Sequence, residues 1–252
     1  MCKTPSGALF ASVLACLAVA GPACAEVAGG SQAGAPAGTP NGDPCAGQEL
    51  TLKIDGEEGS AVVAYSPIVV RGVLHCGTVP IRNAQVLITT TGSSPEASTS
   101  AWVQTTLDGS FSYVLQAGPN RTLNASYTSY SDDPYPSVAA KATIKVRPRI
   151  ELQILPRTVR NGHVITWSGR ILGGPFPEQG VTLDTEVKIN KRWILFAQLI
   201  VRREGDFGYS YRFRRTMRPT TYTFRVALPA TGSGEYPYAF GSSNTASVRV
   251  LP

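Results

Sequence analysis

Residues 70–86, VRGVLHCGTVPIRNAQV, and residues 167–183, WSGRILGGPFPEQGVTL, are two versions of one phrase. Glycines, prolines and apolar residues recur in both copies at a constant spacing. After one gap the match resumes, where GSFSY in the first copy corresponds to GDFGY in the second. Self-similarity of this kind predicts tandem modules. The matched positions are Gly72 and Gly169, Pro80 and Pro177, Gly109 and Gly205, and Phe111 and Phe207.

Alternation of apolar and polar residues predicts that both modules are built from β-strands. In residues 209–214, YSYRFR, every second residue is aromatic, which is typical of a half-buried strand. Residues 109–115 repeat this pattern after an Asp-Gly turn signal, so we expect Phe111 and Phe207 to point into equivalent cores. Further strands are expected at 84–90, 122–129, 138–146, 181–189, 193–201, 220–228 and 246–250. Many short strands separated by Gly, Pro, Asn and Asp favour an antiparallel β-sandwich.

The pattern G-x-L, then P-x-x-N/G-x-x-V, then D-G-x-F resembles bacterial Ig-like and carboxypeptidase-regulatory-like (transthyretin-like) modules. The second copy is similar to repeats in secreted actinobacterial proteins of unassigned function. The resemblance covers nearly the whole chain after the N-terminal segments, and it implies two tandem Ig-like β-sandwiches without catalytic activity. Its motifs are turn and core residues, so they specify a fold and hardly any activity.

The N-terminus has the features of a secretory signal peptide. Lys3 precedes an apolar run over residues 8–20, helix breakers follow, and Ala23-Cys24-Ala25 fits a signal peptidase site. We expect cleavage after Ala25 and a product that is secreted into the medium or associated with the cell surface. Lipidation at Cys16 is the alternative. The apolar run is too short to cross a membrane, and no later segment of the sequence is a spanning candidate.

Composition divides the remaining chain into a linker and two domains. Residues 26–47 are dominated by Ala, Gly and Pro, which predicts a disordered linker. The rest is long enough for two domains of ordinary size. We expect one Ig-like β-sandwich at 48–149 and a second, basic one at 150–252.

Two cysteines remain once residues 1–25 are removed, Cys45 and Cys76. An oxidising compartment favours a disulfide between them, because Cys45 precedes one strand-like run and Cys76 ends another. Free or intermolecular thiols are the alternative. His75 and His163 fall in different modules, so no cluster has metal-ligand spacing and no metal or cofactor is expected.

The excess positive charge belongs to the second module. Residues 48–150 hold 8 Lys and Arg against 8 Asp and Glu, whereas residues 151–252 hold 14 against 7. We expect a basic stripe on adjacent strands, which would attract envelope polymers, acidic polysaccharides or anionic lipid headgroups. A solvated strand face is the alternative interpretation. The candidate residues are Arg202, Arg203, Arg212, Arg214, Arg215, Arg218 and Arg225.

Motifs for chemistry are weak. G-x-S-x-G is absent from the sequence, and Asp132-Asp133 lies in a turn-like stretch better read as solvated than as a Ca²⁺ site. Residues 228–232, LPATG, match a sortase signal, but a strand-like ending follows them instead of a hydrophobic span. We therefore expect a noncatalytic structural or interaction module at the cell surface or in the medium. A carbohydrate- or polyanion-binding protein is the alternative, followed by an unrecognised hydrolase. Expected partners are envelope polymers or another surface protein, and not nucleic acid.

Overall fold

The computed structural model describes residues 40–41, 45–202, 204–229 and 235–252, and all of them fall in one compact unit. The signal peptide, the cleavage after Ala25 and the lipidation of Cys16 lie outside the described residues. So do Arg203, most of the predicted linker and the last three residues of LPATG. Among the described residues, no helix is long and apolar enough to cross a bilayer.

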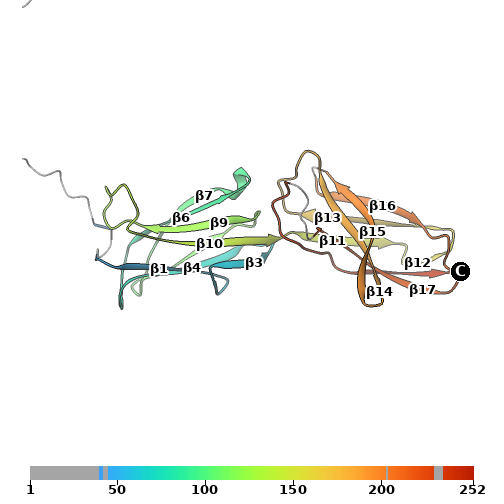
Figure 1. The fold of residues 1–252 in the computed structure, drawn as a ribbon, viewed down its shortest axis with the longest axis horizontal. Helices are drawn as coiled ribbons and strands as arrows, with labels where there is room; N and C mark the ends of the chain where they lie inside the picture. The colour runs from blue at the N-terminus through green and yellow to red at the C-terminus, as the bar shows by residue number, and fades with distance from the viewer. Residues whose placement is uncertain (1–39, 42–44, 203, 230–234) are drawn as a thin grey trace, which may run out of the picture. The chain divides into compact units, whose positions relative to one another are not determined.

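Two sheets form the first sandwich (Figure 1). In one sheet, β1 and β4 are central, β2 and β5 extend it, and β8 pairs with β4. The second sheet has the order β3-β10-β9-β6-β7. The first sheet contains β1 (Gln48–Ile54), β2 (Glu57–Glu58), β4 (Ile68–Cys76), β5 (Val79–Pro80) and β8 (Ser110–Leu115). The second contains β3 (Ser60–Ala64), β6 (Gln85–Gly92), β7 (Thr99–Gln104), β9 (Arg121–Tyr127) and β10 (Val138–Arg147), with the short 3₁₀ turn η1 (Pro95–Ala97) between β6 and β7.

The second sandwich follows the same plan. A three-stranded sheet of order β11-β13-β16 faces a five-stranded sheet of order β12-β18-β17-β14-β15. The strands are β11 (Arg149–Leu155), β12 (Thr158–Arg160), β13 (Val164–Leu172), β14 (Val181–Ile189), β15 (Arg192–Val201), β16 (Asp206–Arg212), β17 (Thr220–Ala227) and β18 (Ala246–Leu251).

Strand order shows that the duplication extends to topology. The core order β1-β4-β8 corresponds to β11-β13-β16, and β3-β10-β9-β6-β7 corresponds to β12-β18-β17-β14-β15. Even the exceptional pairing repeats, because β3 runs parallel to β10 and β12 runs parallel to β18, whereas the other pairs are antiparallel. The predicted fold of two tandem Ig-like β-sandwiches is confirmed.

The repeated glycine and phenylalanine form one contact that occurs twice. Gly72 lies opposite Phe111 across β4 and β8, and Gly169 lies opposite Phe207 across β13 and β16. A Cβ added at Gly72 would lie 2.1 Å from the Phe111 ring, and one at Gly169 would lie 2.4 Å from the Phe207 ring. These distances are shorter than van der Waals contact, so each glycine makes room for the ring that closes its core.

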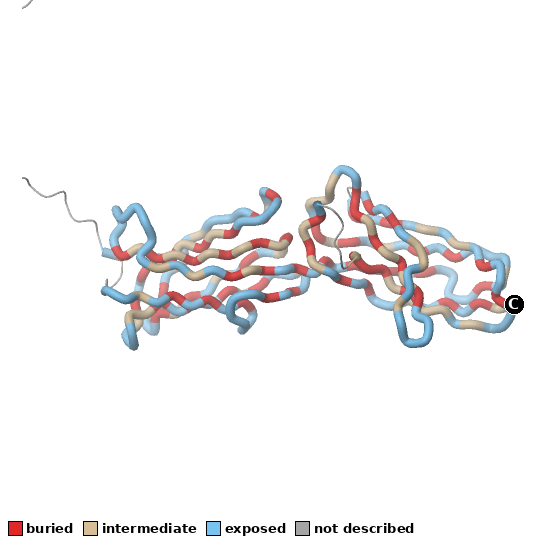
Figure 2. The backbone as a smooth tube through the Cα atoms, in the orientation of Figure 1, coloured by how far each residue is buried: buried red, intermediate tan, exposed pale blue. Residues whose placement is uncertain are grey.

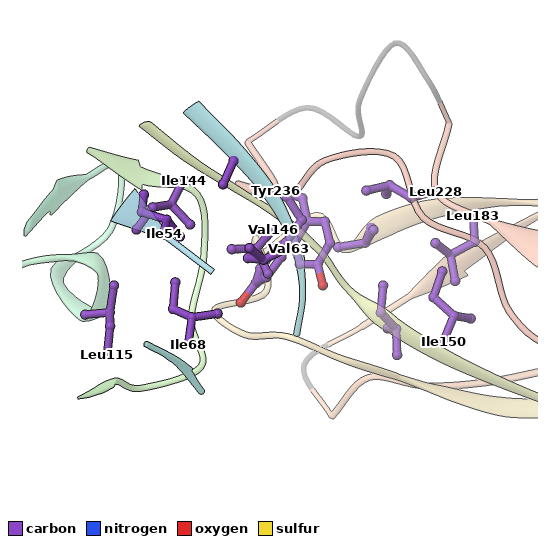
Figure 3. Packing of buried hydrophobic residues seen from close by; sticks show 14 of the residues in the cluster. Ile54, Val63, Ile68, Leu115, Ile144, Val146, Ile150, Leu183, Leu228 and Tyr236 are labelled. Carbon is purple, nitrogen blue, oxygen red and sulfur yellow. The ribbon is translucent and has the colours of Figure 1, made fainter. Parts of the chain in front are cut away.

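The two cores differ in their filling. Aliphatic side chains such as Ile54, Ile144 and Leu115 dominate the first core (Figure 3). The second is centred on Trp167, which is fully buried and has four aromatic rings within 6.2 Å of its own, those of Phe196, Tyr209, Tyr211 and Phe224. Val70 occupies the Trp167 position in the first copy and is equally buried.

Only Pro148 separates β10 from β11, and the segment after residue 234 adds contacts at this junction. Asn120 N–H donates to the Pro237 carbonyl at 2.8 Å, and Ala239 N–H donates to the Val146 carbonyl at 2.8 Å. Burial raises the pKa of Tyr236, whose hydroxyl donates to the Gly173 carbonyl at 2.6 Å. Backbone hydrogen bonds connect residues of the two repeats, and so does the contact between the rings of Tyr65 and Tyr238, whose centres lie 6.0 Å apart.

The N-terminal edge of the first sandwich is attached at two points. Cys45 and Cys76 form the predicted disulfide, with their Cα atoms 6.4 Å apart. Asn41 donates from its side chain to the Gln85 and Thr128 carbonyls, both at 3.0 Å. The described residues at the end of the predicted linker are thus bonded to the sandwich.

Candidate polyanion-binding site

The seven predicted arginines do not form one stripe on adjacent strands. Arg212 ends β16, whose partner is β13, whereas Arg225 lies in β17, between β14 and β18. The chain crosses from one sheet to the other between these two strands, so strands that are consecutive in sequence belong to different layers. The expectation of an adjacent-strand stripe is wrong for this reason.

Two of the seven have local carboxylates. Arg225 Nε lies 2.5 Å from Glu186 Oε2, and the Arg225 guanidinium lies 4.4 Å from the centre of the Trp193 ring. Its side chain is only 20% exposed. Arg202 lines a hollow together with Glu178, Glu204 and Asp206. Arg225 is therefore paired, Arg202 lies among carboxylates, and Arg203 lies outside the described residues.

The remaining four arginines lie together with a fifth that the sequence reasoning missed. Arg212, Arg214 and Arg215 line one open hollow with Ser210 and Tyr211. Arg218 follows in the same connection, and Arg160 ends β12 at the start of the turn that is hydrogen-bonded to this connection. All five arginines are exposed. We call this group, Arg160, Arg212, Arg214, Arg215 and Arg218, the basic end.

The connection that carries the basic end is held by its own buried residues. Phe213 and Thr216 are both 5% exposed, and the Phe213 ring stacks on Tyr222 at 5.3 Å between centroids. Gly162 N–H donates to the Phe213 carbonyl at 2.6 Å, and Thr216 N–H donates to Asn161 Oδ1 at 3.3 Å. Arg214 and Arg215, which lie between these two buried anchors, are both exposed.

A turn brings Arg160 and His163 to the same place. His163 N–H donates to the Arg160 carbonyl at 3.1 Å, and Phe213 N–H donates to the His163 carbonyl at 3.3 Å. His163 is exposed and directly precedes β13, which begins at Val164. Only the contact between this turn and the connection places Arg160 in the group, and spacing along the chain gives no signal of it.

Charge is separated along the three-stranded sheet. At one end, Arg170 faces Asp206 at 3.4 Å and Arg149 faces Glu151 at 2.8 Å. At the other end, Arg212 pairs with Val164. The sequence has no Asp or Glu at 152–177 or at 207–234, the two stretches that supply the basic end. Among the described residues, the ion pairs of this sheet therefore lie at one end, and none of them involves an arginine of the basic end.

Guanidinium groups in this arrangement suit anionic oxygens. Arg offers planar, paired N–H donors that match carboxylate, sulfate or phosphate, and its charge persists at every physiological pH. Several such groups around an open hollow can contact successive charges of a polymer. Among the described residues, no group of three or more His, Cys, Asp or Glu could hold a metal ion. Asp133 N–H donates to the Tyr130 carbonyl at 3.2 Å, which places the Asp132-Asp133 pair in a hydrogen-bonded turn.

Comparisons with known proteins give no family. No protein-family model and no curated protein matches the chain. Among solved structures it is similar to the Yersinia pseudotuberculosis adhesin InvE, at 13% identity over 81% of this chain and 60% of that one, with a TM-score of 0.36. The Escherichia coli adhesin FdeC matches at 12% identity over 82% and 65%, with a TM-score of 0.34. Fibronectin(III)-like modules of Clostridium thermocellum CbhA match at 14% over 79% and 93%, with a TM-score of 0.26. Similarity this low carries no functional argument.

Proposed function

We propose that the protein is a secreted, noncatalytic interaction module whose second sandwich binds an anionic polymer of the cell envelope or its surroundings. The observation that carries this proposal is the basic end. Five exposed arginines are displayed on a hydrogen-bonded connection and turn, in stretches of sequence without a carboxylate. A solvated face that only discourages aggregation would not need three of them, Arg212, Arg214 and Arg215, to line one hollow.

The N-terminal features support secretion. The Lys3 and apolar-run pattern predicts a signal peptide cleaved after Ala25, and the Cys45–Cys76 disulfide fits an oxidising compartment. The finer resemblance, to carboxypeptidase-regulatory-like modules of secreted actinobacterial proteins, is part of this proposal. It is supported by the G-x-L and D-G-x-F residues, which the structure uses in the Gly72–Phe111 contact.

The test is salt-dependent retention of the protein on purified envelope fractions and on immobilised heparin, a sulfated polysaccharide. Arg212→Ser, Arg214→Ser and Arg215→Ser, combined, should abolish retention at low salt, because each lost guanidinium removes a charge-assisted hydrogen bond. The matched control combines Arg71→Ser, Lys141→Ser and Lys145→Ser, which removes equal charge from exposed positions of the first sandwich. Equal retention of the basic-end variant and the wild type would leave the module as a spacer and overturn the proposal.

A further inference from the structure

The β14–β15 hairpin leaves the sheet to which it belongs. β14 pairs with β17 only from Asp184 to Val187, whereas its pairing with β15 continues to Ile189 opposite Arg192. β15 is the edge strand of the sheet. Beyond Val187 the hairpin therefore consists of β14 and β15 alone, without a third strand beside them. Figure 2 shows this tip as an exposed loop that stands out from the sandwich.

Apolar side chains are exposed on both faces of this projecting tip. Ile189 and Ile194 are 44% and 46% exposed, and they follow the face that Val187 buries further down the hairpin. Leu195, which pairs with Glu186 on the opposite face, is 55% exposed. A hairpin with only a structural role would place polar residues on its free faces.

Cations flank the apolar side chains along the hairpin, and the carboxylate that precedes them in the sequence is already paired. Lys188, Lys191 and Arg192 are exposed, and the sequence has no Asp or Glu at 187–203. Glu186 is bonded to Arg225. Trp193 follows the cation Arg192 and precedes the apolar Ile194 in the sequence. Lys188 Nζ lies 5.7 Å and the Arg225 guanidinium 4.4 Å from the centre of its ring.

The turn between β14 and β15 has a lysine at a position where the backbone conformation favours glycine. Asn190 and Lys191 have φ values of 49° and 68°, the left-handed pair of a type I′ hairpin turn. Asn is common at the first of these positions and Gly at the second, where any other residue costs on the order of 1 kcal/mol. Lys191 therefore places a cation at the tip at a cost in local stability, which is expected of a functional position.

We propose that the β14–β15 hairpin docks the protein on an anionic phospholipid bilayer. Exposed aliphatic side chains on both faces suit a fluid surrounding that contacts the whole tip, whereas a folded partner covers one face. Trp prefers the membrane interface, and Lys and Arg near an anionic surface are attracted to its headgroups. This surface is separate from the basic end and does not depend on the binding proposed for that end.

The test is cosedimentation with vesicles of phosphatidylcholine alone or mixed with an equal part of phosphatidylglycerol. Lys188→Ser, Lys191→Ser and Arg192→Ser, combined, should weaken binding to the mixed vesicles by more than about tenfold. Ile194→Ser with Leu195→Ser should weaken it by about tenfold. Controls that should bind like the wild type are Ile200→Ser, which is 64% exposed on the same strand outside the tip, and the variant of the first sandwich with Arg71, Lys141 and Lys145 changed to Ser, which removes the same number of charges.

Lys191→Gly separates binding from folding. Glycine relieves the left-handed backbone, so this variant should unfold at the same or higher denaturant concentration than the wild type while its vesicle affinity falls several-fold. In a Trp102→Phe background, brominated lipids should quench the fluorescence of Trp193, since Trp167 is buried. Vesicle binding that is unchanged in the hairpin variants would overturn the proposal. Lipid-free dimerisation abolished by Leu195→Ser would also overturn it and assign the surface to a second copy.

Discussion

The two sandwiches share one strand order and differ in what stabilises it. Both use the same Gly–Phe contact, the same parallel edge pairing and the same left-handed glycine before the phenylalanine strand, Gly109 and Gly205. The first adds a disulfide and an N-terminal segment to an aliphatic core. The second has an aromatic core, a longer edge strand and all of the excess charge. A duplicated fold has thus kept its geometry while its stabilisation and surface diverged.

The largest expected difference lies in the cores. Trp167→Ala should lower the free energy of unfolding by about 3–5 kcal/mol, since it removes the ring around which four other aromatic rings pack. Val70→Ala, at the equivalent position, should cost about 2 kcal/mol. Denaturant unfolding measures both. Equal costs at the two positions would contradict the difference in core filling.

The second largest expected difference between the two sandwiches comes from the disulfide. Replacing Cys45 and Cys76 together with Ser should lower the stability of the first sandwich by about 3–4 kcal/mol, because the bond closes a loop across 31 residues. Fluorescence of Trp167 and Trp193 should show the second sandwich unfolding at nearly unchanged denaturant concentration, measured in a Trp102→Phe background. A matching shift in the second sandwich would mean that the two unfold as one unit.

The shared contact should respond alike in both copies. Gly72→Ala and Gly169→Ala should each cost about 1–3 kcal/mol, because the new Cβ would overlap a phenylalanine ring and a backbone carbonyl. Gly208→Ala is the control on β16, where the nearest atom to an added Cβ is 3.8 Å away. The equivalence fails if only one of the two glycines is sensitive.

The smallest expected effect is a pH dependence confined to the first copy. Hydrogen bonds from Thr106 and Ser110 lower the pKa of Asp108 from 3.8 to about 2, and Glu204 takes its place in the second copy. A lowered pKa stabilises the fold above pH 3.8, and this contribution is lost as the pH falls through about 2. The stability difference between the wild type and Asp108→Ala should therefore shrink between pH 6 and pH 2. A constant difference would contradict this assignment.

Local pattern predicted the fold well, because alternation and turn residues act over a few positions. The predicted runs correspond to β6, β8, β9, β10, β14, β15, β16, β17 and β18. Short edge strands such as β3 and β12 were missed, since they contain five and three residues and depend on a distant parallel partner. The disulfide was predicted from the ends of two neighbouring strands.

The candidate site was predicted only in part, because the sheet to which each strand belongs decides which arginines lie together. Arg212 and Arg225 are close in sequence and lie in different sheets, whereas Arg160 is distant in sequence and joins the basic end through the 161–163 turn. The sequence pattern predicts ordinary strands on both sides of the β14–β15 tip, and the exposure of the tip follows only from the point where β17 stops pairing with β14. Contacts between distant segments decide both surfaces, and periodicity along the chain carries no information about them.

The most direct test of the claim that the second sandwich makes the contact is the affinity of the protein for heparin, measured over a range of salt concentrations. The account predicts that the variant with Arg212, Arg214 and Arg215 changed to Ser loses more than about tenfold in affinity and shows a shallower salt dependence. It also predicts that the variant with Arg71, Lys141 and Lys145 changed to Ser behaves like the wild type. An equal loss in both variants would show that net charge alone governs binding and would contradict the account.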